Sequence, residues 1–97
     1  MEVIDQVYLA ANNAAGWLFR DHTRTLPASP GSRIVLTVSD GSESWQFECK
    51  SLGDNMYYMT GREWTRFLVG ARIHDRVTLY SKQDGENFHR LEVMRRA

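Results

Sequence analysis

This chain of 97 residues has a single cysteine, no excess of charge of either sign and no long apolar run. Cys49 is its one cysteine, so no disulfide forms within the chain and no cysteine cluster binds a metal. Twelve basic residues balance twelve acidic residues, and this zero net charge counts against a strongly electropositive protein. No window approaches the roughly 20 apolar residues that span a membrane, and the first residues lack the features of a signal peptide. A reducing, intracellular compartment fits these absences.

The usual signals of an enzyme are also missing. His22, His74 and His89 lie in three separate segments, and no pair of them has the spacing of metal ligands. No glycine-rich phosphate loop is present. Cys49 falls on the inward positions of an alternating segment, which is typical of a core residue rather than a nucleophile. We therefore predict no catalysis, no metal and no cofactor.

The composition that remains is that of one globular domain. Hydrophobic residues make up 42% of the chain and charged residues 25%, which is ordinary for a soluble domain. A chain of this length forms one domain, here residues 1–97, with a modest core to which three tryptophans contribute.

Short alternating segments recur along the chain and predict strands. The clearest is Trp45–Lys50, where Trp45, Phe47 and Cys49 face inward and the residues between them face outward. Hairpin turns are indicated at Ser39–Ser42 and at Asp84–Gly85. The predicted strands are 3–9, 17–19, 33–38, 45–50, 56–59, 76–80 and 89–94, and many short strands with tight turns favour a small barrel or sandwich.

Two helices are predicted between these strands. The longer one spans about Gly61 to Val69, where Thr60 and Glu63 have the spacing of a capping box. A helix of one or two turns is predicted from Arg20 to Thr25, before the prolines that follow. The predicted core consists of Trp45, Phe47, Tyr58, Trp64, Phe67, Val77, Leu79, Leu91 and Val93.

A set of motifs in the second half of the chain is specific when taken together. It comprises Trp45 with Phe47, a polar loop, the strand Tyr57-Tyr58-Met59-Thr60-Gly61, then Trp64 with Phe67, Asp75 and two final strands. In this order the motifs resemble the plant-type B-three DNA-binding domain. The chain departs from that family at Arg62-Glu63 and at His74, where glycine is usual, and it lacks the proline after the second strand.

The resemblance implies a mainly β (α+β) fold, a seven-stranded open barrel (pseudobarrel) with two short helices. It also implies a nuclear transcription regulator of plants that binds double-stranded DNA in a sequence-specific way, with other transcription factors as further partners. In this family two loops enter the major groove as the jaws of a wrench, here Leu9 to Gly16 and Lys50 to Met56. The DNA-contact residues that follow are Asn12, Asn13, Arg20, Lys50, Ser51 and Asn55.

The chemistry of these residues leaves two alternatives open. Asparagine reads adenine bidentately, and Lys50 reaches a phosphate or a guanine. Yet asparagine is also a common turn residue, and Asp54 in the second loop would repel phosphate. With few basic residues in either loop, we predict weak and strongly salt-dependent binding. The alternative is a B-three-like fold in which DNA binding is weak or lost and which serves protein interaction or dimerisation.

Overall fold

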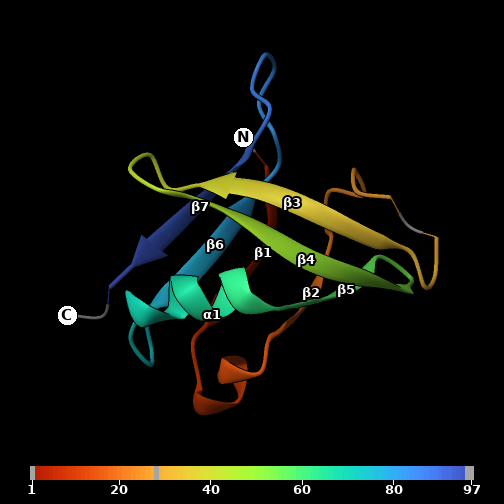
Figure 1. Cartoon of the computed structure of the whole chain (residues 1–97). Helices are drawn as coiled ribbons and strands as arrows, with labels where there is room; N and C mark the ends of the chain where they lie inside the picture. Colours follow the sequence, from red (N-terminus) through yellow and green to blue (C-terminus); the bar gives the residue numbers. More distant parts are fainter. Residues whose placement is uncertain (1, 28, 96–97) are drawn as a thin grey trace.

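Seven strands curl into one sheet that almost closes on itself (Figure 1). The computed structural model describes residues 2–27 and 29–95. Its elements are β1 (Val3–Tyr8), η1 (Ala11–Ala14), β2 (Trp17–Arg20), β3 (Arg33–Ser39), β4 (Ser44–Gly53), β5 (Met56–Thr60), α1 (Arg62–Val69), β6 (Arg76–Tyr80) and β7 (His89–Met94). The strands lie in the order β1-β6-β7-β3-β4-β5-β2, and only β3 and β7 pair in parallel. The predicted mainly β, seven-stranded open barrel is confirmed.

The barrel stays open at the seam between its two edge strands, β1 and β2. One backbone hydrogen bond bridges this seam, from the N–H of His22 to the carbonyl of Ile4 at 3.1 Å. The carboxylate of Asp5 on β1 accepts a second bond from the backbone N–H of Arg20 at 2.8 Å. A side chain therefore satisfies an edge donor that a regular strand ladder would otherwise pair.

Aromatic rings fill the barrel beneath α1. Trp64 is fully buried, and its ring centroid lies 5.4 to 6.1 Å from those of Trp17, Phe47 and Phe67. Edge-to-face pairs such as Phe47 with Trp64 add to the stability gained from burial alone. Most of the predicted core is confirmed. Val93 is only partly buried, and the prediction that Tyr58 lies in the core is wrong.

Tyr57, not Tyr58, is the core tyrosine of β5. Tyr57 is fully buried, whereas Tyr58 is partly exposed and its hydroxyl donates to the carbonyl of Ala15 at 3.3 Å. Because the two tyrosines are adjacent and chemically identical, the sequence does not show which of them points inward. The register of β5 against β2 and β4 decides which one points inward, because a shift of one residue exchanges the two faces.

The predicted capping box of α1 is wrong. Thr60 is the last residue of β5, and its hydroxyl donates to the carbonyl of Ala15 at 3.2 Å instead of capping the helix. The N-cap is Gly61, with φ at +106°, and no side chain caps the first turn. Glu63 accepts bonds from the N–H of Gln46 and from Arg66. Tertiary partners therefore occupy both side chains that the local motif would use.

The predicted helix from Arg20 to Thr25 is also absent, and a turn stands in its place. The buried carboxylate of Asp21 accepts hydrogen bonds from the backbone N–H groups of Thr23, Arg24 and Leu26. Arg24 adopts a left-handed φ of +56°, which a helix does not contain. The short second helical element is η1, in the segment predicted as a loop.

Candidate nucleic-acid interface

The first predicted jaw, Leu9 to Gly16, is a short 3-10 helix rather than an open loop. Asn13 organises it, because its side-chain oxygen accepts from the N–H of Ala10 at 2.8 Å and its amide group donates to the carbonyl of Gly16 at 3.2 Å. Alanine occupies most of the other positions, and the segment carries no charge. The loop therefore presents Asn12 as its exposed side-chain amide.

Side chains from β5 and α1 attach this loop to the barrel. The indole N–H of Trp64 donates to the carbonyl of Asn13 at 2.8 Å, and Thr60 and Tyr58 both donate to the carbonyl of Ala15. At Gly16 the backbone passes so close to β5 that a Cβ atom would lie 2.4 Å from the carbonyl oxygen of Met59. The loop is thus held at the Thr60 end of β5.

The second predicted jaw is a tight turn. β4 continues to Gly53, with a bulge between Ser51 and Gly53, so the predicted polar loop from Ser51 to Asn55 is mostly strand. Only Asp54 and Asn55 connect β4 to β5, with φ values of +52° and +60°. This pair of left-handed residues is the geometry of a type I′ hairpin turn.

Arg20 and Asp21, at the end of β2, fasten this turn. The guanidinium of Arg20 donates to the carbonyl of Asp54 at 3.0 Å, and the N–H of Asp21 donates to the carbonyl of Asn55 at 2.7 Å. The turn therefore lies at the Met56 end of β5, opposite the first loop. The five residues of β5 separate the two loops by about 13 Å, close to the roughly 12 Å width of a DNA major groove.

Between the loops lies an outer face formed by the outward side chains of β2, β5, β4 and β3. The register aligns Leu18, Tyr58, Lys50 and Arg33 in a row across the four strands. Arg20 lies near one end of this face and Glu48 is its exposed acidic strand residue. The strands thus contribute three basic side chains and one acidic side chain to the outer face, although the whole chain is neutral.

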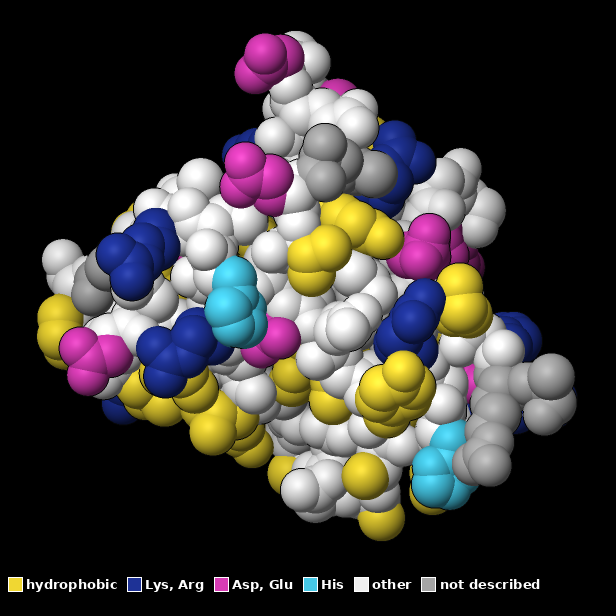
Figure 2. Space-filling model, turned by 180° about the vertical axis from the view of Figure 1, so that it is seen from behind, with side chains coloured by type: hydrophobic (Ala, Val, Ile, Leu, Met, Phe, Trp, Pro, Cys, Tyr) yellow, Lys and Arg dark blue, Asp and Glu magenta, His cyan; other side chains and the backbone are white. Residues whose placement is uncertain are grey.

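The opposite side of the barrel shows no such imbalance. Figure 2 shows Lys and Arg side chains spread among Asp and Glu side chains on the rear face, with hydrophobic side chains between them. An anionic ligand therefore has more reason to approach the outer face.

The six predicted contact residues differ in how available they are. Asn12, Arg20 and Lys50 are exposed, and Asn55 is partly exposed in the turn. The side-chain amide of Asn13 is already engaged within its own loop. Ser51 is 1% exposed and points into the barrel, so the geometry does not favour it as a contact. Arg33, which is not among the predicted residues, is exposed beside Lys50, in a register that the turn at Asp40 to Glu43 sets one residue beyond the predicted turn at Ser39–Ser42.

Three further features concern metal binding, the thiol of Cys49 and membrane-spanning helices. Among residues 2–27 and 29–95, no group of three or more His, Cys, Asp or Glu is arranged to hold a metal ion. Burial raises the pKa of the Cys49 thiol to about 12, so the reactive thiolate is scarce at neutral pH. No helix within the described ranges is long and apolar enough to cross a membrane.

Comparison with known proteins supports the fold. No protein-family profile and no curated protein sequence matches the chain. Its structure is similar to that of an Arabidopsis FUS3–DNA complex, with a TM-score of 0.67, 16% identity, and coverage of 99% of this chain and 100% of that one. The resemblance to the plant B-three domain is confirmed at the level of the fold.

Proposed function

We propose that this chain binds double-stranded DNA through the outer face and the two loops that flank it. The observation that carries the proposal is the similarity of the whole chain to a protein solved in complex with DNA. The basic bias of the outer face, on an otherwise neutral chain, gives that similarity a chemical basis.

Within this proposal the strands and the loops have different roles. Lys50, Arg33 and Arg20 neutralise phosphates, while Asn12 and Asn55 at the tips of the loops meet base edges in the major groove. Asn13 positions its loop through the two hydrogen bonds that it already makes. Recognition is therefore sequence-specific, and the natural setting is a transcription regulator of the plant nucleus.

Three phosphate contacts support only modest affinity. Each neutralised phosphate releases counterions, so the slope of log K against log salt is about −0.9 per contact. We expect weak, strongly salt-dependent binding to a duplex of arbitrary sequence, and tighter binding to a selected sequence. Tight binding of an arbitrary duplex at physiological salt would contradict this proposal.

Lysine offers a matched pair of variants, because the chain contains only Lys50 and Lys82. Lys50 lies on the outer face and Lys82 lies beyond β6, and both are exposed. In fluorescence anisotropy with a labelled duplex, Lys50→Ala should weaken binding and reduce the salt slope by about 1. Lys82→Ala removes the same charge and should leave binding near that of the wild type.

A further inference from the structure

β3 is paired along its whole length on one side only. Its ladder with β4 runs from Arg33 to Ser39, but its ladder with β7 covers only Val38 and Ser39. From Arg33 to Thr37, the side of β3 that faces away from β4 has no strand beside it within residues 2–27 and 29–95. The barrel therefore has an unpaired sheet edge about five residues long.

The hairpin turn shows which backbone groups point to this edge. The N–H of Asp40 donates to the carbonyl of Glu43 at 3.2 Å, so these two residues form a hydrogen-bonded pair. Hydrogen-bonded and non-bonded pairs alternate along an antiparallel ladder. Ile34 and Leu36 therefore bond to β4, and Val35 directs its N–H and C=O to the other side. Within the described ranges the structure shows no hydrogen bond from the Val35 backbone to an element on that side.

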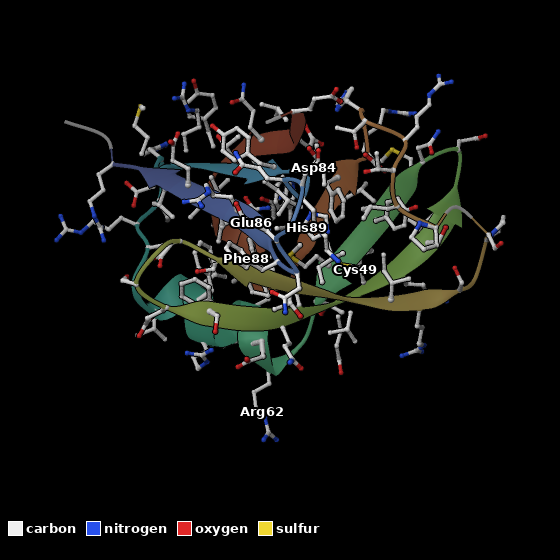
Figure 3. All side chains as sticks on the ribbon, turned by 90° about the horizontal axis from the view of Figure 1, so that it is seen from above. Cys49, Arg62, Asp84, Glu86, Phe88 and His89 are labelled. Carbon is white, nitrogen blue, oxygen red and sulfur yellow. The ribbon has the colours of Figure 1, made fainter. Side chains whose placement is uncertain are left out.

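A hollow of about 730 Å³ lies beside the edge. Ile34 and Leu36 form one wall, Leu26 and Pro27 contribute another, and the segment 81–84 completes it. This last segment belongs to the connection between β6 and β7, and Figure 3, seen from above, shows Asp84, Glu86 and His89 over the middle of the barrel. The hollow bounded by these segments leaves room beside the edge for one short extended chain.

We propose that the β3 edge binds an extended segment of a partner protein as an additional strand. In such strand addition, main-chain hydrogen bonds supply affinity, and pockets for alternate side chains supply specificity. The free edge accommodates about 16 Å of extended chain at roughly 3.3 Å per residue. The partner segment is apolar at the alternate positions that enter the hollow against Leu26, Ile34 and Leu36.

Charge at the rim indicates what the remaining positions carry. Glu2 and Asp84 line the hollow together with Lys82, which leaves an excess of one negative charge. Basic residues at the outward positions therefore fit better than acidic ones. None of the residues proposed to contact DNA lines this hollow, although Arg33 stands at the end of the free edge.

An NMR experiment tests the edge and the ligand together. The probe is a capped hexapeptide in which lysine and valine alternate, added to the whole labelled domain. Without peptide, the Val35 amide should exchange with solvent faster than those of Ile34 and Leu36, which bond to β4. With peptide, the Val35 amide should shift and its exchange should slow, while the two neighbours change little.

Two matched controls isolate main-chain pairing. The same peptide with N-methylated valines keeps its side chains and loses donors, so its binding should be weaker. On the protein, Val35→Pro removes one edge N–H and leaves the bonds to β4, and should weaken binding roughly tenfold, the loss of one hydrogen bond. Val35→Thr keeps the donor and should bind like the wild type.

Several results would overturn the proposal. Equal binding of the plain and N-methylated peptides would mean that contact is through side chains only. Slow exchange of the Val35 amide without peptide would mean that the edge is already paired. A shift of the Val35 amide that depends on protein concentration alone would identify a second copy of this chain as the occupant. If Val35→Pro fails to fold, the comparison of the two peptides on wild-type protein still decides.

Discussion

The two loops at the ends of β5 are held in place by different means. The first, Leu9 to Gly16, depends on side chains: Trp64 donates to it from α1, and Asn13 makes two hydrogen bonds within it. The second, Asp54-Asn55, depends on the left-handed backbone of two residues, and Arg20 is the side chain that donates to it among the described residues. Substitutions that remove a hydrogen-bonding side chain should therefore destabilise the first loop. The second loop should respond mainly to how well the residues at positions 54 and 55 tolerate a left-handed backbone.

The largest effect is expected at Gly16. A Cβ atom there would lie 2.4 Å from the carbonyl oxygen of Met59, and the backbone φ is +155°. Gly16→Ala should therefore lower the free energy of unfolding by about 3 kcal/mol in urea denaturation. Gly41→Ala is the matched control, because its φ is +97° but nothing lies within 4 Å of its Cβ. Gly41→Ala should lower the free energy of unfolding by about 1 kcal/mol, from backbone strain alone. An equal loss for the two variants would show that no steric clash occurs at Gly16.

A smaller loss is expected when the bonds of Asn13 are removed. Asn13→Ala leaves the N–H of Ala10 and the carbonyl of Gly16 without their partner, which should cost about 1 to 2 kcal/mol. Asn12 is its exposed neighbour in the same 3-10 helix, so Asn12→Ala should change stability by less than about 0.5 kcal/mol. Equal effects of the two substitutions in urea denaturation would mean that Asn13 does not organise the loop.

Glycine at Asn55 should act in the opposite direction. Its φ of +60° is left-handed, and glycine is the preferred second residue of a type I′ turn. Asn55→Gly should stabilise the domain by roughly 0.5 kcal/mol, offset in part by greater freedom of the unfolded chain. Asn13→Gly should instead destabilise it. If thermal unfolding shows the same sign for both, the contrast between the loops fails.

The pH dependence of stability should come from outside both loops. Burial lowers the pKa of His89, partly opposed by its hydrogen bond to the carbonyl of Tyr80. An unfolded histidine titrates near 6.5, so stability is full above about pH 6.5 and is lost as the pH falls toward the folded pKa. His89→Gln should reduce the fall in melting temperature between about pH 7.5 and 5.5. Asn13→Ala should leave that fall unchanged, and the opposite pattern would place the titrating group in the first loop.

Alternation made the strands and much of the core predictable. Trp45, Phe47 and Cys49 point inward as their spacing indicates, because side chains in a strand alternate between faces whatever the partner strand is. Local motifs were less reliable. Thr60 and Glu63 have the spacing of a capping box, but Thr60 bonds to Ala15 and Glu63 bonds to Gln46 instead. Such competition between local and distant partners is not visible in one segment.

In the candidate site, too, some features follow from the sequence and others depend on how the strands pair. The family resemblance, through its two loops, predicts Asn12, Lys50 and Asn55 as contacts, and the structure leaves all three accessible. Ser51 is predicted to lie in a polar loop, but it belongs to β4 and faces inward. Arg33 lies beside Lys50 only through the register of β3 against β4, which neither segment shows by itself.

By itself the sequence determined the properties that arise from neighbouring residues: the strands, the turns, the longer helix and the neutral overall charge. Tertiary structure decided which tyrosine enters the core, how the first loop is attached, and which backbone groups of β3 lack a strand beside them. The physical reason is that these features depend on the register and closure of a sheet. Its neighbouring strands, such as β1 and β6 or β3 and β7, come from distant parts of the chain.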